Sequence, residues 1–300
     1  MEPSLHRVLV ATDLSRQATR ALHRALHLPL APAASVCLVH VLPDVDGGRP
    51  DEDVEAEARR RLEELLAQAR AEVQAAGGRV PELSAKLAVG RVFEQIIRTA
   101  QAISADLIVL GARGRAPFHQ HLLGTTAERV ARVGDVPLLV VRRPFRRSYR
   151  RILAAIDGSD ASQAVLQLAL RVGGADLPLL RVLHAYQVPF AGFVSLGATA
   201  EARRRLLGQL RAQAEEVVAA CLEQMEGLQV RCKAIVRRGE PRAVLLAEVD
   251  RQRADLLVVG THGRTGLAHF LLGSVAEAAM RCAPCDVLVA RSASGGSVLT

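Results

Sequence analysis

The sequence repeats itself, and this internal repeat constrains the fold more than any other feature. The segment RVLVATDLS at Arg7 returns as RILAAIDGS at Arg151, and DLIVLGARG at Asp106 returns as DLLVVGTHG at Asp255. The offset is 144 residues for the early segment and 149 for the late one, so the second half has gained five residues in its middle. The chain is therefore a tandem duplication, split within the short segment 145–149.

Each half alternates short Val-, Ile- and Leu-rich runs with longer periodic stretches, which is typical of repeated βα units. Ser15 and Ser159 are the predicted N-caps of the helix that follows the first strand of each half. The stretch from Val54 to Ala76 predicts a helix that Gly77 ends. Buried parallel strands are predicted in the first half at about 7–12, 35–41, 83–89, 107–111 and 136–142.

Repeated βα units predict an α/β fold with two tandem doubly wound domains, each a parallel sheet with helices on both faces. A length of 300 residues is enough for two domains that each bury a core. The domains are predicted at 1–145 and 146–292, and residues 293–300 are predicted to be a flexible tail.

Both halves carry the glycine pattern G-x2-G-x9-G-[S/T], in GARGRAPFHQHLLGT from Gly111 and GTHGRTGLAHFLLGS from Gly260. The first glycine ends a strand, and the third opens a helix together with a hydroxyl residue that can cap the helix or bind a phosphate oxygen. Ligands of doubly wound sheets bind beyond the carboxyl ends of the strands, and helix N-termini attract phosphate. The pattern favours an anion cradle; the alternative is that the glycines only shape a turn.

Two other phosphate-binding motifs are absent from the sequence. A Walker A loop needs a lysine directly after a glycine, and neither Lys86 nor Lys233 follows one. The dinucleotide fingerprint needs a G-x-G triplet, and the chain has none.

Asp13 and Asp157 end the first strand of their halves, and two interpretations of them are open. Their carboxylates can accept hydrogen bonds from a ribose or a base, or they can form an Asx turn or a helix cap. The second strands end at His40–Val41 and His184–Ala185. Backbone groups there could bind an adenine edge, whereas the imidazoles are interpreted as ordinary strand histidines.

Both halves resemble domains of the universal stress protein family over nearly the whole chain. The glycine spacing is similar to the ATP-binding signature of that family, and DLIVLGARG, DLLVVGTHG and LLGSVAE also read as family sequence. The resemblance implies a five-stranded parallel sheet of order 3-2-1-4-5 in each half. It also implies ATP with Mg²⁺ as the ligand, and pairing through the last strands, either between the two halves of one chain or in a homodimer.

The resemblance implies which positions contact ATP. They are Ala11, Asp13, Val41, Gly111, Gly114, Gly124, Thr125 and Thr126 in the first half, and Ala155, Asp157, Ala185, Gly260, Gly263, Gly273, Ser274 and Val275 in the second. The first loop departs from the second by Arg113 in place of His262, and by Pro117 and Phe118, so the second site is expected to bind at least as tightly. Asp286 replaces the proline usual before the last strand.

Composition narrows the class of protein. The net charge of +8 comes almost entirely from arginine, and the basic cluster from Arg142 to Arg151 is interpreted as a solvated linker. Nucleic-acid binding is not expected, because aromatic residues make up only 3% of the chain. No apolar run approaches the roughly 18 residues of a membrane span. The strand beginning near Arg7 leaves no room for a signal peptide, so a cytoplasmic protein is expected.

No convincing catalytic set is visible in the sequence. His262 is interpreted as a phosphate or solvent contact, and the C-x2-C pair Cys282 and Cys285 as structural or incidental. The leading hypothesis is an ATP-binding stress or regulatory protein that acts on a protein partner. The alternatives are a slow ATPase or phosphotransferase using the same pocket, and a dimerisation scaffold that binds no nucleotide.

Overall fold

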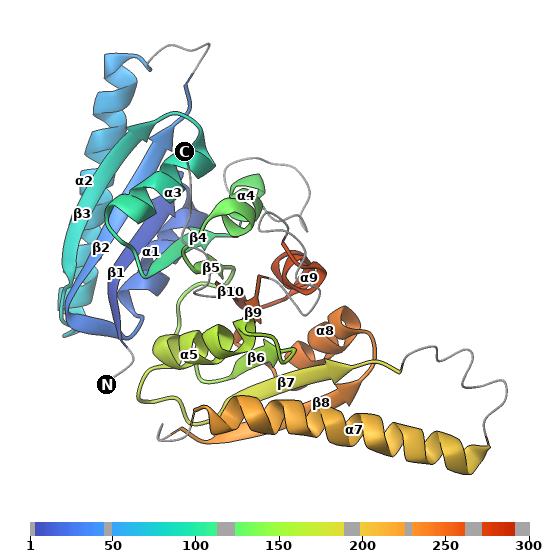
Figure 1. Ribbon diagram of the computed structural model, residues 1–300. Coiled ribbons are helices and arrows are strands. Elements are labelled where there is room, and N and C mark those ends of the chain that lie inside the picture. The colour runs from blue at the N-terminus through green and yellow to red at the C-terminus, as the bar shows by residue number, and fades with distance from the viewer. Residues whose placement is uncertain are drawn as a thin grey trace.

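Two α/β halves lie edge to edge in the computed structural model (Figure 1). The structure describes residues 4–44, 50–112, 124–188, 199–225, 230–261 and 272–291. The first half contains β1 (Leu5–Thr12), α1 (Arg16–Leu26), β2 (Leu30–Leu42), α2 (Glu52–Ala75), β3 (Glu82–Val89), α3 (Val92–Ala102), β4 (Leu107–Gly111), α4 (Thr125–Val133) and β5 (Leu138–Val141). The second contains β6 (Ile152–Ile156), α5 (Ala161–Gly173), β7 (Leu180–Tyr186), α7 (Ala200–Glu223), β8 (Cys232–Arg238), α8 (Pro241–Arg251), β9 (Leu256–Gly260), α9 (Ser274–Cys282) and β10 (Asp286–Ala290).

Two of the three predicted helix ends are confirmed. Ser15 caps α1, since its hydroxyl accepts from the backbone N–H of Ala18 at 3.3 Å. Gly77 follows α2 with a φ of +68°, a left-handed conformation that glycine adopts readily. The prediction for Ser159 is wrong: the N-cap of α5 is Asp160, one residue later, and the Ser159 hydroxyl donates to the Asp157 carboxylate instead.

The strand order 3-2-1-4-5 is confirmed in both halves, and all strand pairs within a half are parallel. The two sheets join through antiparallel pairing of β5 with β10, which makes one ten-stranded sheet. Pairing of the two halves through their last strands is thereby confirmed. In a single domain β5 or β10 would be an unpaired edge strand, and here each of them is covered by the other half.

The β5–β10 register has a pseudo-twofold symmetry. Leu139 pairs with Leu288, its own counterpart at the offset of 149, and the flanking pairs are Leu138 with Val289 and Val140 with Val287. The strands of the two halves therefore run in opposite directions. Because the carboxyl ends of the parallel strands define where ligands bind, the two candidate sites lie at opposite edges of the sheet.

Helices cover both faces of the sheet, as predicted, and the core forms one layer under each set. The first layer packs α1, α2, α5 and α7 on one face, with Leu22, Leu62, Leu166 and Val218 among its buried residues. The second packs α3, α4, α8 and α9 on the other face, around residues such as Ile96 and Met280. Each layer includes residues of both halves, so the halves share a continuous core.

Two equivalent arginines join the halves on the α4/α9 face. Arg142 donates to the carbonyl of Met280 at the end of α9, and its counterpart Arg291 donates to the carbonyl of Ala131 in the last turn of α4. Burial lowers the pKa of Arg291 to about 10, so the side chain is charged at neutral pH. A cation at a helix C-terminus stabilises the helix, and here each half supplies it to the other.

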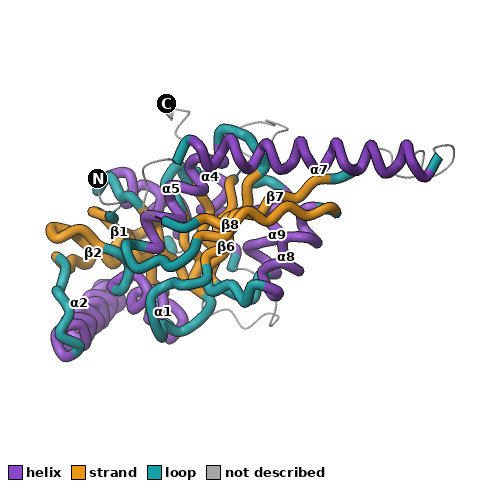
Figure 2. The backbone as a smooth tube through the Cα atoms, turned by 90° about the horizontal axis from the view of Figure 1, so that it is seen from below, coloured by secondary structure: helices purple, strands orange, loops and turns teal. Residues whose placement is uncertain are grey.

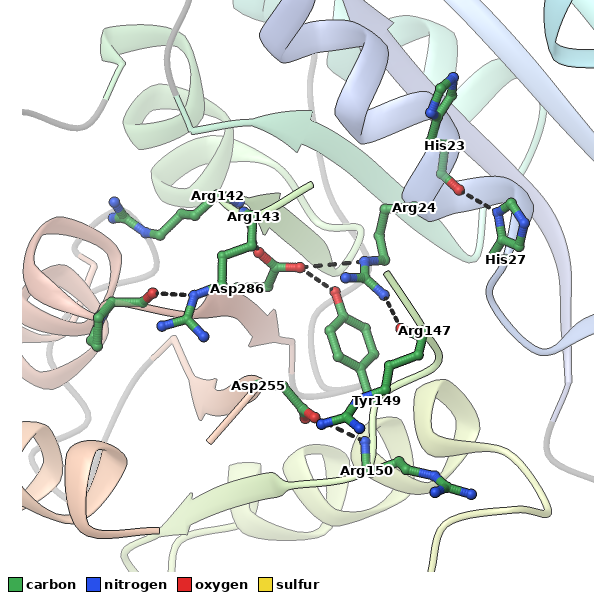
Figure 3. A network of polar contacts seen from close by, with 11 residues as sticks. His23, Arg24, His27, Arg142, Arg143, Arg147, Tyr149, Arg150, Asp255 and Asp286 are labelled. Atoms are coloured by element: carbon green, nitrogen blue, oxygen red, sulfur yellow. Dashed lines mark hydrogen bonds and ion pairs between the residues drawn. The ribbon is translucent and has the colours of Figure 1, made fainter. Parts of the chain in front are cut away.

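The basic segment between the halves is anchored, which corrects its interpretation as a solvated linker. Tyr149 is only 3% exposed and donates to the Asp286 carboxylate at 2.6 Å (Figure 3). Asp286 also accepts from the backbone N–H groups of Arg142 and Arg143, at 2.8 and 3.1 Å. The Arg143 side chain remains exposed, but its backbone is held by a buried carboxylate.

Arg24 of α1 completes this network from the first half. Its Nε lies 3.4 Å from Asp286 Oδ2, and its Nη1 donates to the carbonyl of Arg147 at 2.9 Å. The guanidinium stacks over the rings of Tyr149 and Phe145, at 4.2 and 5.1 Å from their centroids. Burial, followed by the neighbouring Asp286, raises the pKa of Tyr149 well above its usual value, so its hydroxyl stays protonated as a donor.

Candidate functional site

A cavity of about 970 Å³ lies at the carboxyl ends of β6, β7 and β9 in the second half. It is lined by every second-half position that the resemblance implied and that the structure describes: Ala155, Asp157, Ala185, Gly260, Gly273, Ser274 and Val275. These residues come from three strand ends and one helix start, which the sheet order brings together. A volume of this size is within the range of cavities that hold cofactors and other small molecules.

Helix α7 forms one wall of the cavity, and this contribution was not predicted from the sequence. Leu210, Gln213 and Val217 of this helix line it, together with Tyr186 at the end of β7. The N-terminal part of α7 extends past the strands of the sheet (Figure 2), and residues 200–205 are exposed. Only the C-terminal part of the helix therefore packs on the sheet and closes the cavity.

The turn after the first strand has the same Asx geometry in both halves. Asp13 Oδ1 accepts from the backbone N–H of Ser15, and Asp157 Oδ1 from that of Ser159, each at 3.0 Å. Of the two interpretations of these aspartates, the Asx turn is present. Recognition of a ribose or base by Asp13 and Asp157 remains a prediction.

The residues that flank each glycine loop lie next to each other, because a backbone hydrogen bond joins them. Gly124 N–H donates to the carbonyl of Ala112 at 3.0 Å, and Gly273 N–H to that of Thr261 at 2.7 Å. Gly124 and Gly273 are the N-cap residues of α4 and α9. Thr125 and Ser274 are therefore the first helical residues and do not cap. The first turns of these helices present backbone N–H groups beside the strand ends, as anion binding requires.

The two strand histidines hold neighbouring strands together. His40 Nδ1 bonds to the carbonyl of Thr12 at 2.8 Å, and His184 Nδ1 to that of Ile156 at 2.9 Å. This bears out their interpretation as structural residues. His184 is 5% exposed and is among the residues that line the second-half cavity.

The first-half positions occupy the equivalent places at the opposite edge of the sheet. Ala11 and Asp13 lie at the end of β1, Val41 in β2 and Gly111 at the end of β4, while Gly124, Thr125 and Thr126 begin α4. Ala11 and Val41 are buried, whereas Asp13 is half-buried. The predictions for Gly114, Gly263, His262, Arg113, Pro117 and Phe118 lie outside the described residues, as does the tail 293–300.

The C-x2-C pair has features that argue against a redox site. Cys285 is fully buried and Cys282 is exposed, and both thiols are free. Burial, and after it the charge of Asp286, raises the pKa of Cys285 to about 12, so its reactive thiolate is scarce at neutral pH. Within the described ranges, no three His, Cys, Asp or Glu side chains are grouped so that they could hold a metal ion.

We expect this difference in burial to appear as a difference in alkylation. Treating the folded protein with iodoacetamide at pH 8 should modify the exposed Cys282 and leave Cys285 unmodified, because burial both shields that thiol and keeps it protonated. Peptide mass spectrometry measures both positions in one sample, and the unfolded protein is the control in which both react. Rapid modification of Cys285 in the folded chain would contradict its structural role.

Two groups of residues at the site and the interface were missed by sequence reasoning. One group is Ser162, which is only five residues from Asp157 but was not identified as a site residue, together with the α7 wall, which lies far along the chain from the ends of β6 and β9. The other group is Asp286 with its partners Arg24 and Tyr149. The aspartate in place of a proline was a signal for this group, but the sequence does not show which cation it meets. In the part of the chain that the structure describes, no helix has both the length and the apolar character needed to cross a membrane.

Comparison with known proteins agrees with this architecture. The model of the universal stress protein family matches residues 4–142 and again residues 148–291. A universal stress protein of Mycolicibacterium smegmatis is 28% identical over 297 residues, which is 95% of this chain and 96% of that protein. Another, from Methanocaldococcus jannaschii, is 32% identical over 144 residues, which cover 48% of this chain and 82% of that protein.

Solved structures show the same fold over the full length. The crystal structure of a universal stress protein from Archaeoglobus fulgidus has a TM-score of 0.63 at 20% identity, covering 95% of this chain and 96% of that one. A protein of unknown function from Pseudomonas aeruginosa has a TM-score of 0.66 at 19% identity, covering 97% and 94%. Because the family model matches both halves and nearly all of the sequence, this chain belongs to the universal stress protein family, with two copies of the domain in tandem.

Proposed function

We propose that this chain is an ATP-binding regulatory protein of the stress response. The observation that carries the proposal is the second-half cavity, which gathers Asp157, Ala185, Gly260 and Ser274 at the carboxyl edge of the sheet. The start of α9 lies beside the cavity and offers backbone N–H groups for phosphate. The carboxyl ends of the strands offer polar groups for ribose and base. Mg²⁺ would enter with the nucleotide, coordinated mainly by its phosphates.

The first half would bind a second nucleotide at the opposite edge of the sheet. Its Asp13 turn and its α4 start repeat the arrangement of Asp157 and α9. Occupancy of either site would change the surface around the glycine loops, and a protein partner that senses this change would transmit the signal. A cytoplasmic location and a homodimer belong to the same proposal.

We expect isothermal titration of the full chain with Mg²⁺ and ATP to show binding at up to two sites. Asp13→Ala and Asp157→Ala should each weaken one site by about 1–3 kcal/mol, the scale of a lost hydrogen bond to a charged group. The matched pair serves as its own control, since each variant leaves the other site intact. Absence of binding heat, of a thermal shift and of co-purified nucleotide would contradict the proposal and favour the scaffold alternative.

A slow ATPase using the same pocket is the second candidate. The same cavity would hold ATP, but a hydrolase also needs a base oriented toward a water molecule. A phosphate-release assay with Mg²⁺ separates the two functions. Any turnover is expected to be slow, and a rate on the order of 1 s⁻¹ or faster, which is within the normal range of enzymes, would overturn the binding-protein proposal.

A further inference from the structure

Ser162, in the first turn of α5, holds the turn that carries Asp157. Its side chain is buried, with 3% of the residue exposed. Its Oγ accepts from the backbone N–H of Gly158 at 3.1 Å and from that of Asp157 at 3.4 Å. The same hydroxyl donates to Asp157 Oδ1 at 3.4 Å. One hydroxyl therefore fixes both the backbone of the turn and the carboxylate on it.

The Asp157 carboxylate is held at one oxygen by three donors. Besides Ser162, its Oδ1 accepts from the backbone N–H of Ser159 at 3.0 Å and from the hydroxyl of Ser159 at 2.6 Å. Three donors on one oxygen restrict rotation of the carboxylate, so its orientation in the cavity is set before any ligand arrives. Both Asp157 and Ser162 line that cavity. Preorganised groups bind more tightly because less ordering is left for the binding step.

The first half holds the equivalent turn differently. There the hydroxyl of Thr12 in β1 accepts from the backbone N–H of Leu14 at 3.0 Å. At the offset of 144, Ile156 stands in place of Thr12, and Ser162 stands where the first half has Ala18. The hydroxyl that accepts from the backbone of the turn therefore comes from the strand in the first half and from the helix in the second. In the second half it also donates to the Asp157 carboxylate.

We propose that Ser162 is a positioning residue of the second-half site, which orients the Asp157 carboxylate toward the ribose hydroxyls of the bound nucleotide. The inference rests on the proposed function, because it needs a nucleotide in this cavity. It adds that the second site distinguishes ribose from deoxyribose through this serine. Ala18 supplies no hydroxyl at the first site, so the same dependence is absent there.

The test measures the affinity of the full chain for ATP, 2′-deoxy-ATP and 3′-deoxy-ATP by titration calorimetry. An Asp13→Ala background weakens the first site, so the heats report the second. Ser162→Ala should weaken ATP binding about fivefold to tenfold, the scale of one ordinary hydrogen bond, because the serine acts on the ligand only through the carboxylate. It should weaken the deoxy analogue that lacks the recognised hydroxyl much less. The ratio of ATP to deoxy-ATP affinity should therefore fall, which a general loss of stability would not cause.

A double-mutant cycle adds a second readout. If Ser162 acts through Asp157, Ser162→Ala should have almost no effect on affinity once Asp157 is alanine. Ser148→Ala, at an exposed serine of the linker, is the control and should change nothing. An unchanged ribose ratio in Ser162→Ala, or additive effects in the cycle, would overturn the proposal while ATP binding stands. Failure of the parent protein to bind ATP would instead refute the proposed function itself, and with it this role for Ser162.

Discussion

Replacing Asp286 with alanine is expected to lower the free energy of unfolding by about 3–5 kcal/mol, the cost of removing one partner from a buried ion pair. Asp286 is fully buried and lies 3.4 Å from Arg24, which is itself only 5% exposed. The substitution leaves that guanidinium without its counter-charge. It also leaves the Tyr149 hydroxyl and the backbone N–H of Arg142 without their acceptor.

Urea denaturation measures this loss, and Asp255→Ala is the matched comparison. Asp255 also accepts two backbone N–H groups of the linker, from Arg150 and Arg151, but its side chain is 18% exposed. Its loss should cost less, about 1–3 kcal/mol. Freed from Asp286, the linker should also be cut faster by trypsin after Arg147, an exposed arginine. A loss below about 1 kcal/mol for Asp286→Ala, with unchanged proteolysis, would mean that the network does not hold the halves together.

Gly158→Ala and Gly208→Ala are expected to change stability in opposite directions, although the chemical change is the same. Gly158 has a φ of +81°, and a Cβ atom there would lie 2.7 Å from Cγ1 of Val217 in α7. Left-handed strain and overpacking together should cost about 1–3 kcal/mol. Gly208 lies within α7, and outside the backbone of that helix no described atom lies within 4 Å of an added Cβ, so alanine should stabilise the helix by about 0.5–1 kcal/mol.

Part of the cost at Gly158 arises from Val217, and the rest from the left-handed backbone, which the equivalent residue Leu14 also adopts at a φ of +62°. The double variant Gly158→Ala/Val217→Ala should therefore recover the part of the lost stability that is due to overpacking. Since Val217 and Asp157 both line the cavity, Gly158→Ala should also weaken ATP binding, whereas Gly208→Ala should not. Equal effects of the two glycine substitutions on unfolding would show that α7 does not pack on this turn as described.

Local patterns in the sequence were enough to predict most of the strands and helices and to propose where a ligand would bind. Periodicity predicted β1, β3 and β4 to within about two residues, because a buried parallel strand needs a short apolar run whatever surrounds it. It predicted β2 only from residue 35, whereas the strand begins at Leu30 and includes Pro32. The repeat then assigned each predicted position in one half to an equivalent position in the other, so that Asp157 corresponds to Asp13 and Ser274 to Thr125. These residues lie at strand ends or helix starts, which local pattern identifies well.

The contacts between residues that are distant in the sequence depend on how the two halves pack. The contact between Asp286 and Arg24 depends on the antiparallel pairing of β5 with β10, which brings α1 of one half beside the last strand of the other. The α7 wall depends on how far along β7 that helix packs. Such contacts come from the geometry of packed elements, and a single sequence carries no local pattern that records them.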